Sequence, residues 1–226
     1  MAMALGHLHE KNVIYRDLKL ENVLLGTDGY INLIDFGICR KLQGTEVAKT
    51  HCGTPEYFAP EMIKQDGHGF ALDWWTLGIA TYEMLVGFTP FYSGIHDKKN
   101  KKMKDMITNK EVTFPVMKKH GYELSKEAKD FIQKLLVKDP KKRLGAKKGV
   151  DELFKHKWLS DIDRSKYLAK GIKIKESEKP KLDSEEDLRY FNDDITKLPI
   201  RDTQITLEQR QKIMDKMHLF DDFERS

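Results

Sequence analysis

The segment that most constrains the fold is residues 71–86, a long and strongly apolar run. Its length and composition predict a buried helix. A second helix is predicted after Ser125, which can serve as its N-cap. Its apolar positions follow helical spacing: Ala128, Phe131, Ile132, Leu135 and Leu136. We expect Asp139-Pro140 to stop this helix, and we expect a mainly helical chain.

Shorter elements are predicted on either side of these helices. Residues 2–9 look like the end of a helix, and we predict a last short helix over residues 150–156. Two apolar runs, 23–25 and 30–34, flank a Gly-Thr-Asp-Gly sequence that is typical of a β-hairpin turn. Residues 35–61 show no clear period, so we expect them to form an ordered loop.

The composition narrows the class of protein. The 226 residues are 39% hydrophobic and 34% charged, which suits one domain, or one domain with a tail. We find no run of 18 apolar residues and no signal peptide, so we expect neither a membrane span nor secretion. Cys39 and Cys52 are too few to staple a secreted scaffold, which favours a cytoplasmic location, with the nucleus as a further one. The net charge of +4 is too small to indicate nucleic-acid binding.

Residues 160–226 differ in character from the preceding part. They contain 30 charged residues and few aromatic ones, a composition that cannot build its own core. We therefore separate residues 1–159 from residues 160–226, and we expect the second part to lie on another surface, anchored at a few points. Five lysines within residues 98–104 predict a solvated helix face or loop, with a docking patch as the alternative.

Several polar residues near the N-terminus have the chemistry of phosphoryl transfer, which needs positioning and charge neutralisation more than covalent help. Asp17 can orient an attacking hydroxyl and accept its proton, while Lys19 can neutralise the moving phosphate. Asn22 and Asp35 offer the oxygen ligands that Mg²⁺ prefers, and the predicted hairpin between them brings them together. Taken singly, these residues are typical of caps, turns and loops. Their combination at this spacing predicts phosphoryl transfer.

Three motifs in one order carry a resemblance to a known family. They are Tyr15-Arg16-Asp17-Leu18-Lys19-Leu20-Glu21-Asn22, Asp35-Phe36-Gly37 and Ala59-Pro60-Glu61. Together they resemble the signature set of protein kinases. The resemblance extends through Asp73-Trp74-Trp75 and Lys142-Arg143-Leu144-Gly145, over residues 1–159. Tyr15 and the stretch Gly53-Thr54-Pro55-Glu56-Tyr57 look like the AGC group of serine/threonine kinases, in its protein kinase B and serum/glucocorticoid-regulated kinase branch.

The resemblance implies a fold class and a reaction. The fold would be mainly α (α+β), with a protein-kinase-like C-terminal lobe over residues 1–159 and a short β-hairpin at the catalytic site. Residues 160–226 would form the extended C-terminal tail of AGC kinases. The reaction would be ATP-dependent phosphorylation of serine or threonine. The residues implied to bind ATP and Mg²⁺ are Asn22, Asp35, Phe36 and Gly37. Of these, Asn22 and Asp35 would be the metal ligands.

The resemblance also implies roles on the substrate side of the site. Lys19 is similar to the residue that marks serine/threonine specificity, with Thr54 bridging to Asp17. Gly53 and Pro55 flank Thr54 and would face the substrate. The implied partners are therefore protein substrates, recognised close to the reacting hydroxyl.

Two further sets of charged residues gain roles from the resemblance. Glu21 and Glu83 match acidic positions that read arginines upstream of the target hydroxyl, a pairing that gives both energy and geometry. Simple surface solvation is their alternative. Glu61 and Arg143 match a buried ion pair, and Asp73 matches the aspartate that holds the catalytic-loop backbone.

Regulation is implied at Thr50, which occupies the position of the activation-loop phosphothreonine that an upstream kinase modifies. A phosphate there can pair with Arg16, and Arg40 is a plausible second partner. We expect phosphorylation to order residues 38–54.

The tail contains four further residues that resemble parts of regulatory motifs. Thr203 falls at the turn-motif phosphosite. Phe220 and Phe223 resemble the hydrophobic motif, and Glu224 supplies a constant charge where relatives carry a phosphorylated residue. A small local cluster is the alternative for the two phenylalanines.

The two cysteines flank the activation loop. Similar pairs occur in protein kinase B-like kinases. Two free thiols are the simpler interpretation, and a redox switch that closes the loop between Cys39 and Cys52 is the alternative.

The sequence contains neither a Gly-x-Gly-x-x-Gly loop nor a strand lysine before Tyr15, the parts that cover ATP in the family. We therefore expect the N-terminal lobe to be absent and ATP binding by this chain to be poor. One hypothesis is the C-terminal part of an active kinase. The other is an inactive docking or competitor module that acts through its substrate groove and Phe-x-x-Phe tail.

Overall fold

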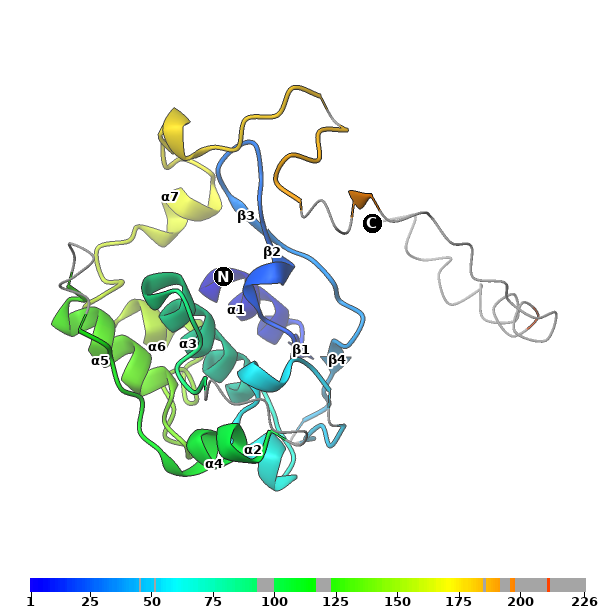
Figure 1. The fold of residues 1–226 in the computed structure, drawn as a ribbon, viewed down its shortest axis with the longest axis vertical. Helices are drawn as coiled ribbons and strands as arrows, with labels where there is room; N and C mark the ends of the chain where they lie inside the picture. The colour runs from blue at the N-terminus through cyan, green and yellow to red at the C-terminus, as the bar shows by residue number, and fades with distance from the viewer. Residues whose placement is uncertain are drawn as a thin grey trace. The chain divides into compact units, whose positions relative to one another are not determined.

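The computed structural model describes residues 1–44, 46–50, 52–92, 100–116, 123–184, 186–191, 196–197 and 211. The chain divides into two compact units, Met1–Lys181 and Leu182–Ser226. The first unit holds the α-helices α1 to α7 and two small sheets (Figure 1). In the second unit, Arg189 donates to Asp183 and lies 2.7 Å from Asp187. The predicted boundary between residues 159 and 160 stays a prediction.

The core of the first unit is built around α3 (Ala71–Val86), which packs against α5 (Lys126–Leu135) and α1 (Ala2–Glu10), as Figure 1 shows. Most of α3 is buried, so the prediction of a buried helix is confirmed. Gly78 permits the close packing of α5, because a Cβ there would lie 2.8 Å from Leu136 Cδ2.

The second predicted helix is confirmed at its start and wrong at its end. Ser125 Oγ accepts a hydrogen bond from Ala128 N at 3.0 Å, as an N-cap does. The helix ends at Leu135, before Asp139-Pro140. The physical reason is tertiary: Leu144 N donates to the carbonyl of Lys134 at 3.0 Å, which replaces a continuing helical hydrogen bond.

Two antiparallel pairs of strands frame residues 15–22, the segment predicted to be the catalytic loop and called by that name below. Strands β2 (Val23–Leu25) and β3 (Ile31–Leu33) pair with Val23 opposite Leu33, which confirms the predicted hairpin. Strands β1 (Val13–Ile14) and β4 (Arg40–Lys41) pair with Val13 opposite Lys41.

Residues 35–61 were predicted to form an ordered loop, and most of the described residues there lie outside helices and strands. The prediction missed three short elements: β4, the 3₁₀ turn η2 (Pro55–Tyr57) and the start of α2 (Pro60–Lys64). Strand β4 depends on a partner far along the sequence, so it leaves no local period. The helix α2 begins at a proline, which fits the first helical position.

The remaining elements lie around this core. They are η1 (Leu20–Asn22), α4 (Lys101–Asn109), α6 (Val150–Phe154), α7 (Arg164–Leu168) and η4 (Glu176–Glu178). Within the first unit, the segment that contains α7 is anchored on the hairpin, because the rings of Tyr30 and Tyr167 lie 5.1 Å apart. Within the described part of the chain, no helix has the length and apolar character that crossing a membrane requires.

Candidate active site

The backbone of the catalytic loop is held by Asp73, in the first turn of α3. This carboxylate is fully buried, and it accepts hydrogen bonds from Tyr15 N and Arg16 N, both at 2.9 Å. His9 Nε2 lies 2.7 Å from the same carboxylate. Arg16 adopts a left-handed conformation with φ of 73°, and the two hydrogen bonds hold it there. The geometry of the loop is therefore set by the helical core beneath it.

The polar residues of the loop converge on Asp17. The Asn22 amide donates to the Asp17 carbonyl at 2.9 Å and to its carboxylate at 3.0 Å. Lys19 Nζ lies 3.3 Å from the Asp17 carboxylate and 3.3 Å from Thr54 Oγ1. The connection between Thr54 and Asp17 therefore passes through the Lys19 ammonium. The Lys19 ammonium therefore contacts both the Asp17 carboxylate and the Thr54 hydroxyl.

The hairpin carries Asp35 back toward the loop, because Ile34 N donates to the carbonyl of Asn22 at 3.0 Å. Asp35 is exposed and its backbone φ is 59°. Its carboxylate accepts a hydrogen bond from Gly37 N at 3.1 Å. The Phe36 ring lies 5.5 Å from the ring of Tyr15, whose hydroxyl donates to the carbonyl of Ile34. Burial raises the pKa of Tyr15, so this hydroxyl stays protonated and continues to donate.

The oxygen donors of the site fit a magnesium ion that is shared with phosphate. The Asn22 NH₂ group is committed to Asp17, which leaves its amide oxygen available, and Asp35 presents an exposed carboxylate. Magnesium is usually held by one or two carboxylates together with substrate phosphates. No cluster of three or more His, Cys, Asp or Glu side chains in the described part of the chain forms a complete metal site. The donor set is therefore suited to a metal that arrives with a nucleotide.

Residues 53–57, which were expected to face the substrate, lie beside the loop and contact α3. Gly53 has φ of 102°, and a Cβ there would lie 3.3 Å from the Arg16 carbonyl, so glycine permits close approach to the loop. Thr54 and Pro55 follow and begin η2. The segment therefore lies directly against the catalytic loop.

Tyr57 is a site residue that the sequence analysis missed. Its hydroxyl donates to the Glu83 carboxylate and accepts Leu20 N at 3.4 Å. Burial and then Glu83 raise the pKa of Tyr57, so it remains a donor. Glu83 is thereby oriented beside the catalytic loop, while Glu21 is exposed. Only its place inside the Gly-Thr-Pro-Glu-Tyr stretch could have drawn attention to Tyr57.

The pair Glu61 and Arg143 joins α2 to the helical core. Arg143 donates to both carboxylate oxygens of Glu61, at 2.8 and 2.9 Å, and to the carbonyl of Ala71 at 2.7 Å. The exposed fractions are 1% for Arg143 and 4% for Glu61. A pair this deeply buried with this geometry fixes α2 against the start of α3.

The two arginines expected to bind a phosphate on Thr50 contact other groups here, although Arg16 Nη1 is buried without a hydrogen-bond partner among the described residues. Arg16 Nε donates to the carbonyl of Ile38 at 2.6 Å, and Arg40 forms a 2.5 Å ion pair with Glu46. Thr50 is exposed. Its role as a phosphorylation site stays a prediction.

The two cysteines are free thiols in this structure. Cys39 donates to the carbonyl of Tyr15 at 3.5 Å, and burial raises the pKa of its thiol to about 11. A thiol with a raised pKa holds little thiolate at neutral pH, which disfavours the proposed redox switch. Thr203, Phe220, Phe223 and Glu224 lie outside the described residues, and their roles stay predictions.

The polar cluster around Asp17 holds the kinds of groups that phosphoryl transfer needs. Residues 1–159 match the protein kinase domain family, and the chain belongs to that family.

The relatives that the chain resembles are serine/threonine protein kinases. It is 40% identical to human RAC-beta serine/threonine-protein kinase over 195 residues, which cover 85% of this chain and 38% of the relative. It is 38% identical to the mouse RAC-beta kinase over 218 residues, covering 96% and 42%. It is 43% identical to the RAC kinase of Drosophila melanogaster over 195 residues, covering 85% and 30%. The predicted AGC-kinase resemblance is confirmed, and the chain spans less than half the length of these curated relatives.

Proposed function

We propose that residues 1–159 form the C-terminal lobe of a serine/threonine kinase that transfers the ATP γ-phosphate to protein substrates with upstream arginines. The observation that carries this proposal is the position of Lys19 Nζ, which lies 3.3 Å from both the Asp17 carboxylate and Thr54 Oγ1. The family uses ATP together with a divalent metal, and Asn22 and Asp35 are the residues that would hold the metal. When bound, Mg²⁺·ATP supplies the phosphoryl group and neutralises part of its charge.

The residues of this chain would then perform three tasks. The Asp17 carboxylate would orient the substrate hydroxyl and receive its proton. The Lys19 ammonium would neutralise charge on the moving phosphoryl group, and Thr54 would hold Lys19 in place through its hydroxyl. Glu83, oriented by Tyr57, would pair with a substrate arginine, with Glu21 as a second carboxylate.

The proposal includes a second lobe that covers the nucleotide. The 226 residues contain no glycine-rich phosphate loop, and the relatives are more than twice as long. We therefore propose that activity requires an N-terminal lobe outside this sequence. We also propose that the protein is located in the cytoplasm, or in both the cytoplasm and the nucleus. Its Thr50 would be phosphorylated by an upstream kinase.

The test is a chimera in which the N-terminal kinase lobe of the human RAC-beta relative precedes residue 1. We expect the chimera to phosphorylate a peptide that carries arginines upstream of serine, and Asp17→Asn to lower kcat by about 10²–10⁴-fold. The control is Asp161→Asn, which removes an exposed carboxylate from a turn after α6. Equal rates for the two variants would overturn the role of Asp17.

A second candidate function is a docking or competitor module, because Tyr57 and Glu83 contact each other through side chains that both belong to this chain. The chain alone should then bind the arginine-containing peptide without ATP, and Glu83→Gln should weaken that binding. Peptide binding by the chimera but not by the chain alone would contradict this candidate.

A further inference from the structure

Tyr30 is the residue through which the β2–β3 hairpin is attached to the rest of the first unit. Of residues 23–34, all of which the structure describes, Tyr30 alone is buried, with 8% of its surface exposed. The two strands have three residues each. A two-stranded hairpin is at best marginally stable unless it packs against a further layer. The hairpin therefore depends on the residues that cover Tyr30.

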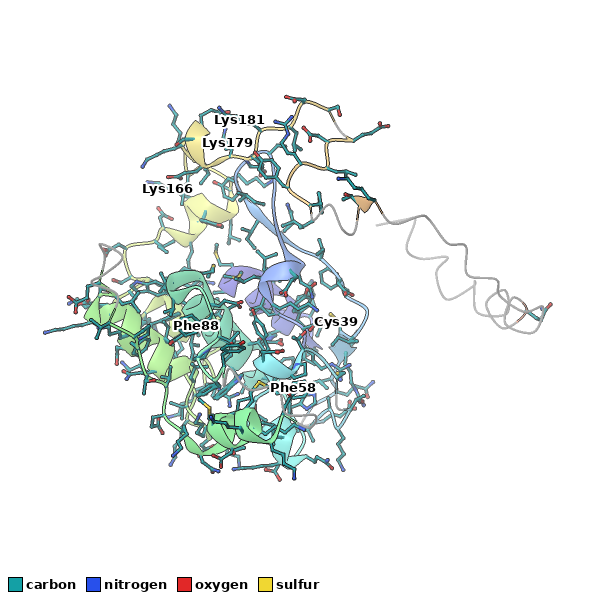
Figure 2. All side chains as sticks on the ribbon, in the orientation of Figure 1. Cys39, Phe58, Phe88, Lys166, Lys179 and Lys181 are labelled. Carbon is teal, nitrogen blue, oxygen red and sulfur yellow. The ribbon has the colours of Figure 1, made fainter. Side chains whose placement is uncertain are left out.

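The segment that covers Tyr30 consists of residues 167–174, which we call the clamp. Figure 1 shows α7 and the chain after it beside the hairpin, and Figure 2 labels Lys166, just before the clamp, at the same end of the first unit. The Tyr30 hydroxyl accepts a hydrogen bond from Ile172 N at 3.2 Å and donates one to the Ile172 carbonyl at 3.0 Å. Its ring lies 5.1 Å from the ring of Tyr167. One side chain of the hairpin therefore makes both polar and apolar contacts with the clamp.

The turn of the hairpin is held by the same segment. Lys170 Nζ lies 2.5 Å from the Asp28 carboxylate, and both side chains are exposed. The Ile174 side chain packs so closely on the turn that a Cβ on Gly29 would lie 2.6 Å from it. Exposed ion pairs contribute little to stability, so the Tyr30 hydroxyl and the Ile174 side chain provide most of the attachment.

The base of the hairpin carries the two residues that would hold the metal. Asn22 directly precedes β2, and Asp35 follows β3 after one residue. Ile34 N donates to the Asn22 carbonyl at 3.0 Å, which closes the base. Asp35 has φ of 59°, and such a left-handed conformation persists only where the surrounding structure enforces it. A hairpin that is fixed at its turn is one source of this restraint.

We propose that Tyr30 is a positioning residue, which acts through the clamp and the hairpin to fix Asp35 beside Asn22. The role of the metal rests on the proposed function, but the connection from Tyr30 to Ile34 can be measured in the chain by itself. The clamp belongs to residues 160–226, the predicted tail, so the tail would set how tightly the site holds Mg²⁺. The alternative is that the contacts at the base hold Asp35 without any help from the clamp.

The first test is hydrogen exchange of the full chain by NMR, with one reporter amide at each end of the hairpin. Gly26 N donates to the Tyr30 carbonyl near the turn, and Ile34 N donates to the Asn22 carbonyl at the base. Tyr30→Phe removes the hydroxyl but keeps the ring, so both hydrogen bonds with the clamp are lost. We expect exchange at both amides to become about tenfold faster. Faster exchange at the Gly26 amide alone, or at neither amide, would overturn the proposal.

Two controls separate the hydroxyl from the ring and the hairpin from the whole fold. Tyr167→Phe makes the same chemical change in the neighbouring ring and keeps the ring contact, so both exchange rates should stay unchanged. Leu144 N, which donates to the Lys134 carbonyl in the helical core, is the reference amide and should keep its rate in Tyr30→Phe. Equal acceleration by the two variants, or equal acceleration at all three amides, would give Tyr30 only a general role in stability and overturn the proposal.

The second test measures the Mg²⁺ requirement of the RAC-beta chimera at saturating ATP. Tyr30→Phe should raise the free Mg²⁺ concentration for half-maximal rate by about tenfold, the lower end of the effect of groups that orient metal ligands. The KM for the peptide should stay unchanged, a separation that a general loss of stability would not produce. An unchanged Mg²⁺ requirement, or a change in the peptide KM alone, would overturn the proposal. An inactive parent chimera would instead count against the proposed function, and the exchange rates would then decide the role of Tyr30.

Discussion

The two sides of the catalytic loop differ in how they are covered. On the α3 side, Asp73 is fully buried and accepts the loop's own N–H groups. On the hairpin side, Leu24, Leu25, Ile34 and Phe36 are 37%, 47%, 36% and 51% exposed. Exposed apolar side chains that lie close together are typical of interaction surfaces. The comparison shows that the helical core sets the loop geometry, and it supports the proposal that a second lobe covers the hairpin side.

The largest expected effect is on the buried side, at the pair Glu61 and Arg143. Arg143→Ala leaves the Glu61 carboxylate buried without its partner, so the free energy of unfolding should fall by about 3–5 kcal/mol. Urea unfolding of the purified chain measures this value. The matched control is Glu127→Ala, which breaks the 2.9 Å pair with Lys157, whose side chain is 80% exposed. This control should cost less than about 1 kcal/mol, and equal losses would contradict the comparison.

The next effect compares one leucine from each side. Leu77 is 3% exposed and Leu25 is 47% exposed. Leu77→Ala should lower the free energy of unfolding by about 2–5 kcal/mol, because it leaves a cavity in the core. Leu25→Ala should change it by less than about 0.5 kcal/mol.

The Leu25 result can be sharpened with the RAC-beta chimera. If the added lobe covers the hairpin, Leu25→Ala should destabilise the chimera more than the chain alone. The same small effect in both proteins would mean that this surface stays exposed in the chimera.

The smallest effect concerns Lys138, whose amine lies 4.2 Å above the Phe91 ring and 5.1 Å from the Trp75 ring. Burial lowers its pKa to about 8, against 10.5 for the ordinary side chain. Between these pH values the unfolded chain holds more protons than the folded chain, so this residue makes the free energy of unfolding rise with pH. Because the group is only partly buried, we expect a rise of about 1 kcal/mol at most.

The measurement for Lys138 is urea unfolding at several pH values from 7 to 10. Lys138→Met removes the titrating amine but keeps the apolar stem, so the difference between the two proteins isolates this residue from the tyrosines. A difference that does not change with pH would contradict the buried amine.

The sequence predicted the parts of the fold whose signal is local. The buried helix α3 follows from its apolar run, and the start of α5 follows from Ser125 and the apolar spacing after it. The pairing of Val13 with Lys41 was missed, because two-residue strands acquire their partner only in the folded chain. The end of α5 was also predicted wrongly, because it depends on a contact outside the helix. Leu144 N, ten residues after Lys134, donates to the Lys134 carbonyl.

Some residues of the candidate site were predicted from the sequence and others were missed. Asp17, Asn22 and Asp35 could be identified because they stand in motifs that resemble the protein-kinase signature set. His9 on Asp73, at 2.7 Å, and Tyr57 on Glu83 were missed. Both contacts join residues that lie far apart in the sequence, and neither residue type is distinctive by itself.

The central claim is that the catalytic loop of this chain is complete while its nucleotide site needs a second lobe. The direct measurement is the affinity for Mg²⁺·ATP, by calorimetry, of the chain alone and of the RAC-beta chimera. We predict no saturable binding to the chain at millimolar nucleotide and clear binding to the chimera that is weakened by Asp35→Asn. Micromolar binding of Mg²⁺·ATP to the chain alone would contradict the account.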